Sequence, residues 1–377
     1  MQVCPCYVDV EAETGGVANV VRQISLGAAA RGRRVVIVCG NRELGAVKAE
    51  PGRSRVPGHD LERIILGQRA NPLLGPTGQL REVLQGLPQP YVAHVHTCFS
   101  AFTRAAMATF AGKGAPFVFT PHGKLSAGFL RRRRVQKALW WFLAEKGPAR
   151  HAARVVLCSE GEAGGLPGLG LDGGFDVVPN GYSPWRGALP AGDGSLQGPY
   201  VLFLGYLDPR KQPELLVRAF GLSRARQSHR LVIAGPDSYG HRAKIEREVR
   251  HTGLDCRVIL YGPAYGAEKQ RLLSGARCFC LPSRAEGQPI TLSEALGAGV
   301  PLVISAECNF GAAAAAGAAV ELDTFDEGDW AAALDAVCLD GPRRSAMAAA
   351  AHRFAEGLTW DRIVERWLEI YDAVSGP

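Results

Sequence analysis

The sequence contains no uninterrupted apolar run of about 18 residues, the length that a membrane-spanning helix requires. Its N-terminus lacks a charged segment followed by an apolar stretch, so we expect no export signal and a cytoplasmic protein. Long polar or low-complexity tracts are also missing. A chain of 377 residues, with 47% hydrophobic and 21% charged residues, is typical of a globular protein and long enough for two domains.

Charge of one sign is only mildly in excess. The sequence has 43 basic and 36 acidic side chains, which give a formal net charge of +7. So small an excess does not indicate nucleic-acid binding, and we expect no nucleic-acid partner. It suits an anionic small molecule or an anionic membrane surface. Much of it lies in one run, Arg131–Arg134, followed by Lys137.

The ten cysteines form no C-x-x-C pair, the spacing most typical of zinc sites. Several lie inside apolar segments such as Val35–Cys39 and Cys278–Leu281. We interpret them as buried free thiols in a reducing compartment. A zinc site at Cys4 and Cys6, or at Cys278 and Cys280, would need a second pair of ligands that the sequence does not offer. No G-x-G-x-x-G follows an early strand, which disfavours a dinucleotide-dependent oxidoreductase.

The second half of the sequence alternates short apolar segments with stretches of helical spacing. The apolar segments are Val201–Leu204, Leu231–Ala234, Val258–Tyr261, Cys278–Leu281 and Pro301–Ile304. This alternation predicts an α/β fold with a parallel, doubly wound sheet. Such sheets bind ligands at the carboxyl ends of their strands.

The first half repeats the pattern less regularly. Residues on one predicted helix face are Val17, Val20, Val21, Ile24 and Ala28, and the predicted strands are Val35–Cys39, Val92–Val95, Phe117–Thr120, Val155–Cys158 and Phe175–Val178. An opening strand near Val3 is short and is followed by Pro5. Between the halves, Arg186–Pro199 is rich in Gly, Ala and Pro without periodicity, which is typical of a linker.

The segment Pro282–Ala295 follows a predicted buried strand and opens a helix. Backbone amides near Ile290 and Thr291 would then lie at a helix N-terminus, where unpaired N–H groups and the helix dipole favour a diphosphate. Glu286 and Glu294 flank this position, and carboxylates there can accept hydrogen bonds from sugar hydroxyls. Alternatively, Glu294 in the first helical turn complements the dipole and Glu286 is a solvated loop residue.

Residues Glu286 to Glu294 resemble the E-x7-E motif of retaining glycosyltransferases, especially glycosyltransferase family 4. Further segments resemble this family in the expected order: Gly15-Gly16, Pro121-His122-Gly123, Val178–Gly181, Phe203–Gly205 with Arg210-Lys211, Leu231–Gly235, Ala298–Val303 and the helix Trp360–Tyr371. The resemblance implies a GT-B fold, with two Rossmann-like domains facing a central cleft. It implies an N-terminal acceptor-side domain at 1–185, a linker at 186–199, a donor domain at 200–357, and a C-terminal helix at 358–377 that returns to the first domain.

The resemblance also assigns roles to the matched positions. Glu294 would bind the ribose of a nucleoside-diphosphate sugar, and Glu286 the transferred hexose. Arg210 and Lys211 would neutralise the departing diphosphate. The remaining donor-side positions would be Gly15, Gly16, Asn180, Gly287, Ile290 and Thr291, and His122 would orient the transferred sugar. The reaction would retain the anomeric configuration, and the leaving phosphate would help to take the acceptor's proton.

One departure from the family pattern concerns the cationic groups at the diphosphate. Tyr206 follows Gly205 where the family usually has an arginine, and Arg210 is the candidate to replace it. Many other transferases hold a metal ion with a D-x-D pair. The sequence has no D-x-D, so we expect no metal and no cofactor.

The stretch 130–146 is basic and amphipathic, because Val135, Ala138, Leu139 and Phe142 fall on one helical face. We interpret it as a helix that packs this face on the first domain. The alternative is peripheral contact with anionic lipid at the inner face of the membrane, or guidance of a lipid-diphosphate acceptor.

The acceptor would be a glycan, a lipid-linked or a small-molecule hydroxyl, with cell-envelope or exopolysaccharide assembly as a setting implied by the resemblance. Two other functions stay open. One is another enzyme on the same scaffold, such as a sugar-nucleotide epimerase or a phosphorylase. The second is a non-catalytic nucleotide-sugar binding protein, for which Tyr206 is the main support.

Overall fold

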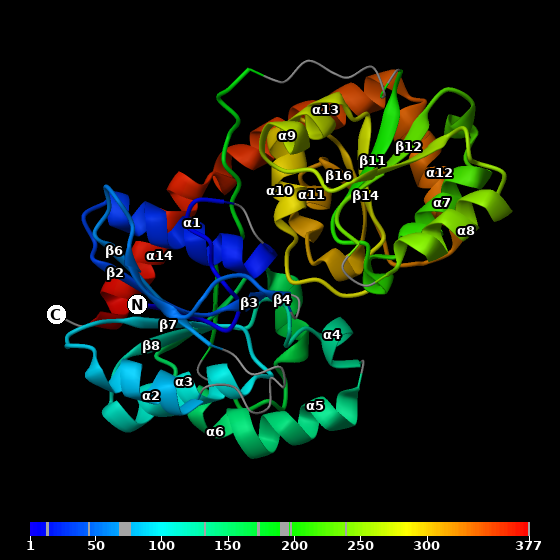
Figure 1. Cartoon of the computed structure of the whole chain (residues 1–377). Coiled ribbons are helices and arrows are strands. Elements are labelled where there is room, and N and C mark those ends of the chain that lie inside the picture. Colours follow the sequence, from blue (N-terminus) through cyan, green and yellow to red (C-terminus); the bar gives the residue numbers. More distant parts are fainter. Residues whose placement is uncertain are drawn as a thin grey trace. The chain divides into compact units, whose positions relative to one another are not determined.

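The computed structural model describes residues 1–12, 15–43, 46–67, 77–131, 133–171, 174–188, 196, 198–237 and 240–375. The chain divides into two compact units, of which the first is Met1–Asn180 with Trp360–Pro377 and the second is Gly181–Thr359. Each unit contains a mostly parallel sheet flanked by helices (Figure 1). The predicted α/β class with two doubly wound sheets is confirmed. Of the predicted linker 186–199, residues 189–195 and 197 lie outside the described part of the chain.

The first unit is built on a sheet with the strand order β10-β9-β8-β7-β1-β2-β6-β5, in which only the β5–β6 pairing is antiparallel. Its strands are β1 (Gln2–Cys4), β2 (Val35–Gly40), β5 (Gly52–Arg55), β6 (Leu61–Leu66), β7 (Ala93–His96), β8 (Phe117–Thr120), β9 (Arg154–Leu157) and β10 (Asp176–Val177). A separate pair consists of β3 (Arg42–Glu43) and β4 (Ala46–Val47). Although β1 is short, it lies inside the sheet between β2 and β7.

Helices flank this sheet and connect its strands. They are α1 (Gly16–Ala30), α2 (Thr77–Gly86), α3 (Ala101–Lys113), α4 (Ala127–Arg131), α5 (Arg134–Trp140), a π-helical turn (Trp141–Glu145), α6 (Lys146–Ala149) and α14 (Trp360–Ser375). The helix α14 packs against α1, where a side chain at Gly27 would collide with Val364. Arg33, three residues after α1, forms an ion pair of 2.7 Å with Asp372 of α14.

The second unit has a fully parallel sheet with the order β13-β12-β11-β14-β15-β16. Its strands are β11 (Tyr200–Leu204), β12 (Arg230–Ala234), β13 (Val258–Gly262), β14 (Cys278–Leu281), β15 (Leu302–Ser305) and β16 (Ala319–Leu322). Its helices are α7 (Pro213–Leu222), α8 (Arg242–His251), α9 (Gly266–Gly275), α10 (Ile290–Gly297), α11 (Gly311–Ala315), α12 (Glu327–Cys338) and α13 (Gly341–Ala355). The strands β11 and β14 are wholly buried, as their continuous apolar runs predict.

The carboxyl ends of β11 and β12 approach each other closely. Gly235 has a φ of +145°, and a Cβ there would lie 1.8 Å from the carbonyl oxygen of Gly205. The amide of Gly205 donates to Ala234, and that of Gly235 donates to Gly262. Glycine is required at position 235 because both the backbone conformation and the space exclude a side chain. This contact sets the place where the loop after β11 begins.

The ten cysteines are free thiols, and all but Cys6 and Cys256 are buried, as predicted. Cys278 and Cys280 lie with their sulfur atoms 3.6 Å apart without a bond. Among the described residues, no helix is both long and apolar enough to cross a bilayer.

The prediction for the stretch 130–146 is wrong in two respects. It is not one helix, because Arg133, with a φ of +54°, separates α4 from α5. Its predicted inner face also points outward, since Val135, Leu139 and Phe142 are exposed. The helix is held by a different stripe, which includes Trp141 and Glu145, because Glu145 accepts hydrogen bonds from the backbone that begins α3.

Candidate functional site

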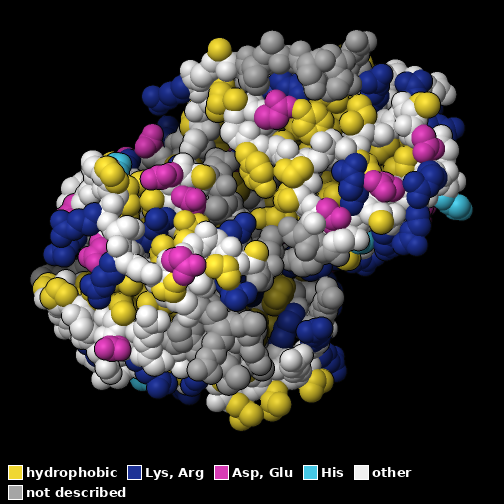
Figure 2. Space-filling view, viewed as in Figure 1, with side chains coloured by type: hydrophobic (Ala, Val, Ile, Leu, Met, Phe, Trp, Pro, Cys, Tyr) yellow, Lys and Arg dark blue, Asp and Glu magenta, His cyan; other side chains and the backbone are white. Residues whose placement is uncertain are grey.

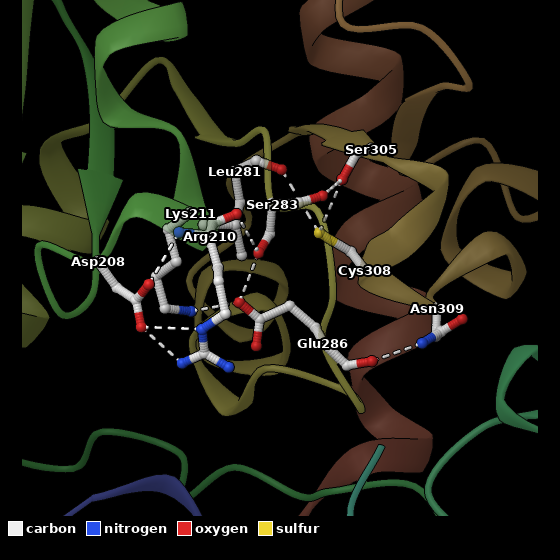
Figure 3. Close-up of polar contacts among 9 residues, drawn as sticks. All are labelled: Asp208, Arg210, Lys211, Leu281, Ser283, Glu286, Ser305, Cys308 and Asn309. Carbon is white, nitrogen blue, oxygen red and sulfur yellow. Dashed lines mark hydrogen bonds and ion pairs between the residues drawn. The ribbon is translucent and has the colours of Figure 1, made fainter. Parts of the chain in front are cut away.

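The loop after β11 carries two consecutive basic residues, Arg210 and Lys211, at the carboxyl end of the central strands. A 3₁₀ turn, Pro209–Lys211, is capped by Asp208, whose Oδ1 accepts from the Arg210 amide at 2.8 Å. Gln212, with a φ of +52°, then turns the chain into α7. In this turn the side chains of Arg210 and Lys211 bind different carboxylates (Figure 3).

Lys211 is paired with Glu286 in a partly enclosed site. Its Nζ lies 2.6 Å from Glu286 Oε1, and the two side chains are only 13% and 18% exposed. The same Oε1 accepts a hydrogen bond of 2.7 Å from the Ser283 hydroxyl. Two donors therefore orient one carboxylate oxygen of Glu286, and Figure 3 shows this side chain directed toward both.

The loop that carries Glu286 is held by backbone contacts on both sides. The Arg284 amide donates to the Arg210 carbonyl at 2.7 Å, so this loop is joined to the lysine-bearing turn. The Glu286 amide donates to Glu307, and Asn309 Nδ2 donates to the Glu286 carbonyl at 2.6 Å. Preorganisation of this kind fixes the position of a side chain before a ligand arrives.

Arg210 binds the carboxylate of Asp208 through Nε at 2.9 Å and Nη2 at 2.6 Å. Burial acts to raise the pKa of Asp208, but the hydrogen bonds and charge of Arg210 outweigh this effect and hold the pKa below its ordinary value. The positive charge of Arg210 is thereby largely compensated by Asp208. Arg210 and Lys211 are thus each paired with a carboxylate, although with different ones.

The helix α10 begins at Ile290, with Pro289 as its N-cap. Proline has no side-chain hydrogen-bonding group, so it leaves the amides of the first turn, which include Thr291, without a side-chain cap. Glu294 is the fifth residue of α10, and no acidic residue lies in the first turn. The placement of Glu294 in the first turn is therefore wrong, and with it the interpretation that this residue serves only the helix dipole.

Glu294 instead makes a contact outside its helix. Its Oε1 lies 2.6 Å from Nζ of Lys269 on α9, and both side chains are largely enclosed, at 11% and 14% exposed. The two glutamates of the E-x7-E pattern thus each pair with a lysine of the second unit. Gly287 and Tyr206, which also belong to this unit, are both half-buried.

Three predicted donor-side residues belong to the first unit. Gly15 is the N-cap of α1 and Gly16 is its first residue, at which a Cβ would meet no atom within 4 Å. A side chain at position 16 would therefore enter open space. Asn180 is buried, with 7% of its surface exposed, and is the last residue before the second unit.

His122 lies two residues after β8 with a φ of +52°, in the left-handed region that non-glycine residues rarely adopt. Glu162 holds this turn, because its carboxylate accepts from the amides of Gly123 at 2.8 Å and Cys158 at 3.1 Å. Burial raises the pKa of Glu162 to about 7. For His122, burial and then the charge of Lys124 lower the pKa to about 3, so its ring is neutral at neutral pH.

The ring of His122 ends a chain of hydrogen bonds. His122 Nε2 lies 2.9 Å from Nδ1 of His96, and His96 Nε2 lies 2.7 Å from Oε1 of Gln2. An amide oxygen only accepts, so His96 carries its proton on Nε2 and its Nδ1 is an acceptor. His122 therefore donates from Nε2, and its Nδ1 is left as an acceptor. The Cys158 sulfur lies 3.7 Å from that Nδ1.

The chain continues into the C-terminal helix. Gln2 Nε2 donates to the Tyr371 hydroxyl at 3.1 Å, and this hydroxyl lies 2.7 Å from His94 Nδ1. His94 Nε2 lies 2.8 Å from the Thr120 hydroxyl. Burial lowers the pKa of His94 and also that of His96, which keeps these rings neutral. Gln2 of β1, which also binds Tyr371 of α14, and His96 of β7 thus determine the tautomer of His122.

Comparison with known proteins shows which family each unit matches. The family profile of glycosyltransferase family 4 matches residues 14–186, and that of glycosyl transferases group 1 matches residues 193–354. This chain belongs to the family 4, group 1 glycosyltransferases. The resemblance seen in the sequence motifs is thus confirmed.

One curated relative is a D-inositol 3-phosphate glycosyltransferase of Kineococcus radiotolerans, which is 30% identical over 216 residues, or 52% of this chain and 50% of the relative. Half of that protein's length is thus left unmatched. Among solved structures, sucrose-phosphate synthase from Thermosynechococcus elongatus has a TM-score of 0.78 at 19% identity, covering 99% of this chain and 98% of that one. Anabaena HepE in complex with UDP and glucose has a TM-score of 0.72 at 16% identity, covering 99% and 100%. These likenesses confirm the GT-B fold.

Within this family 4 chain, the structure brings some predicted residues together and leaves others separate. Arg210, Lys211 and Glu286 share one cluster, Ile290, Thr291 and Glu294 lie along α10, and Gly15, Gly16, Asn180 and His122 belong to the first unit. Motif comparison missed the residues that orient them, which are Ser283, Lys269, Asn309, Gln2, Tyr371 and Glu162.

The hydrogen-bond chain makes a spectroscopic prediction for His122. With histidine-selective ¹⁵N labelling, we expect the Nε2-protonated neutral tautomer between pH 6 and 8, because its pKa is held at about 3 and its Nε2 donates to His96. In Gln2→Leu the acceptor for His96 is lost, so the tautomers of His122 should mix. A wild-type His122 that is protonated on Nδ1 at neutral pH would contradict the assignment.

Proposed function

We propose that the protein transfers a hexose-type sugar from a nucleoside-diphosphate sugar to an acceptor hydroxyl with retention of anomeric configuration. The observation that carries the proposal is the enclosed Lys211–Glu286 pair, oriented by Ser283, in the loop that leads into α10. A cation, first-turn amides and a sugar-binding carboxylate are then available to one diphosphate sugar. The complex of HepE with UDP and glucose supports a donor of this class.

In the proposed reaction, the bond between the sugar's anomeric carbon and the phosphate oxygen breaks, and its electron pair stays with the departing diphosphate. The acceptor oxygen forms the new bond on the same face, and its proton passes to the departing phosphate oxygen. Lys211 and the amides of Ile290 and Thr291 stabilise the developing negative charge. Glu286 and His122 orient the sugar, with Nδ1 of His122 accepting a hydrogen bond from a hydroxyl. The reaction as proposed uses no metal, since the sequence lacks a D-x-D pair.

The acceptor that we propose is a glycan, a lipid-linked sugar or a small phosphorylated polyol. The last class is suggested by the names of the inositol-phosphate and sucrose-phosphate relatives. Cell-envelope or exopolysaccharide assembly in the cytoplasm is the setting in which we place the enzyme.

The test is release of nucleoside diphosphate from a panel of UDP-, GDP-, ADP- and dTDP-sugars, with EDTA present and with the three acceptor classes added in turn. We expect turnover with one donor, retention of configuration in the product, and a loss of turnover in Glu286→Gln. Donor binding by calorimetry without release, with every acceptor class, would instead favour the non-catalytic binding protein that Tyr206 suggests. Interconversion of the donor sugar without transfer would indicate an epimerase.

A further inference from the structure

The helical segment from α5 to α6 is anchored to the first unit by one side only. The indole of Trp141, which is 1% exposed, donates to the Leu169 carbonyl at 3.0 Å. Glu145 accepts from the amides of Phe99 at 2.8 Å and Ser100 at 2.9 Å, where α3 begins. Because Trp141 and Glu145 face the first unit, the opposite side of the helix must face away from it.

That opposite stripe is apolar and exposed. Its side chains and their exposed fractions are Val135 at 75%, Leu139 at 60%, Phe142 at 50% and Leu143 at 78%. The intervals of three and four residues place them along one face. Figure 2 shows hydrophobic side chains gathering at the lower edge of the molecule, where Figure 1 places α5. A contiguous apolar stripe of this kind marks an interaction surface.

The charges around the stripe have one sign. Exposed or half-buried basic residues of the segment are Arg131, Arg133, Arg134, Lys137, Lys146 and Arg150. Glu145 is the only acidic residue between positions 127 and 150, and it is buried. Lys146 lies over the ring of Phe142 and Lys137 over that of Phe129, so cationic groups contact aromatic side chains of this segment directly. We call the four apolar and six basic residues the α5 face.

We propose that the α5 face docks on an anionic lipid bilayer. The four apolar side chains would enter the boundary between headgroups and acyl chains, and the basic residues would contact lipid phosphates. A second copy of this chain is a poorer occupant, because self-association would bring two sets of like charges together. The surface lies outside the donor-site residues, so the inference stands independently of the proposed reaction.

The test is flotation of the purified full chain with phosphatidylcholine vesicles that contain or lack phosphatidylglycerol. We expect binding only to the anionic vesicles, weakened by salt because phosphate contacts are screened. The double variant Leu139→Asp/Leu143→Asp should lower the vesicle affinity about tenfold or more. Arg133→Glu/Arg134→Glu should abolish the preference for anionic lipid. The matched control is Leu222→Asp, at a residue that is 62% exposed on α7 of the second unit, and it should bind like the wild type.

Circular dichroism and thermal unfolding establish that each variant is folded. The proposal is overturned if the wild type fails to float with anionic vesicles at low salt, or if the Leu139/Leu143 variant floats as well as the wild type. It is also overturned if sedimentation shows a dimer that this variant dissociates, since the face would then be an interface between copies. Donor turnover with a water-soluble acceptor should be the same in the wild type and the leucine variant, which separates this test from that of the reaction.

Discussion

Replacement of Lys211 by alanine should lower kcat/KM for sugar transfer by about a hundredfold or more, the effect typical of losing one preorganised group that stabilises developing negative charge. Lys211 lies beside Glu286, which is proposed to bind the sugar, whereas the guanidinium of the adjacent Arg210 is held at 2.6 Å by Asp208, which has no proposed role in binding the donor. Steady-state kinetics on the donor identified in the panel would measure the loss. Most of it should fall on kcat, since the charge on the diphosphate increases only as the bond breaks.

Two variants make this prediction specific. Lys211→Arg preserves the charge and should recover part of the rate, whereas Arg210→Ala should cost less than Lys211→Ala. Thermal unfolding must show that the second unit stays folded, because Lys211→Ala leaves Glu286 without its cation. Loss of one such stabilising group should lower the rate far more than threefold. If the rate of Lys211→Ala stays within about threefold of the wild-type rate, Lys211 does not act on the leaving group.

The pairing of Lys211 with Glu286 has a consequence for donor binding. The Lys211 ammonium lies 2.6 Å from the carboxylate that is proposed to hold the sugar. A diphosphate would compete with Glu286 for Lys211, so entry of the donor would rearrange this pair. Glu286→Ala should therefore reduce kcat by more than it weakens donor binding, because it removes the sugar contact and leaves the cation available for phosphate.

Alanine at Glu294 should act mainly on affinity, raising the dissociation constant of the donor about 10- to 100-fold. A carboxylate that accepts hydrogen bonds from ribose hydroxyls contributes about 1.5–3 kcal/mol, and each 1.4 kcal/mol is a factor of ten. Calorimetric titration with the nucleoside diphosphate alone isolates this contact, since that ligand carries no transferred sugar. Glu294→Ala should thus mainly weaken donor binding, whereas Glu286→Ala should mainly lower kcat.

The control for Glu294 is Glu246→Ala on α8, which removes a partly exposed carboxylate paired with Arg242 in the same unit. It should leave donor affinity unchanged. Because Glu294 is bound to Lys269, Lys269→Ala should weaken the donor less than Glu294→Ala does. Equal donor affinity in the wild type and Glu294→Ala would remove Glu294 from the ribose site and leave it as a structural partner of Lys269.

Several features of the fold and of the candidate site could be predicted from the sequence alone. The buried strands of the second unit were predicted from continuous apolar runs, because a parallel strand covered on both faces has no polar side. The segment Glu286–Glu294 was located because a strand, a loop and a helix start follow one another in the sequence. These features depend on neighbours within a few residues, so local periodicity is sufficient to recognise them.

The tertiary structure alone decided which groups meet. Lys211 reaches Glu286 from 75 positions away, and Gln2 joins Tyr371 across 369 positions. The outward direction of Leu139 and Leu143 likewise depends on Glu145, which accepts hydrogen bonds from the backbone just before an earlier helix, α3. Periodicity shows that a helix has an apolar face but not which face its domain will bury. That choice is made by contacts between distant parts of the chain, because a buried carboxylate must find its hydrogen-bond donors wherever the fold places them.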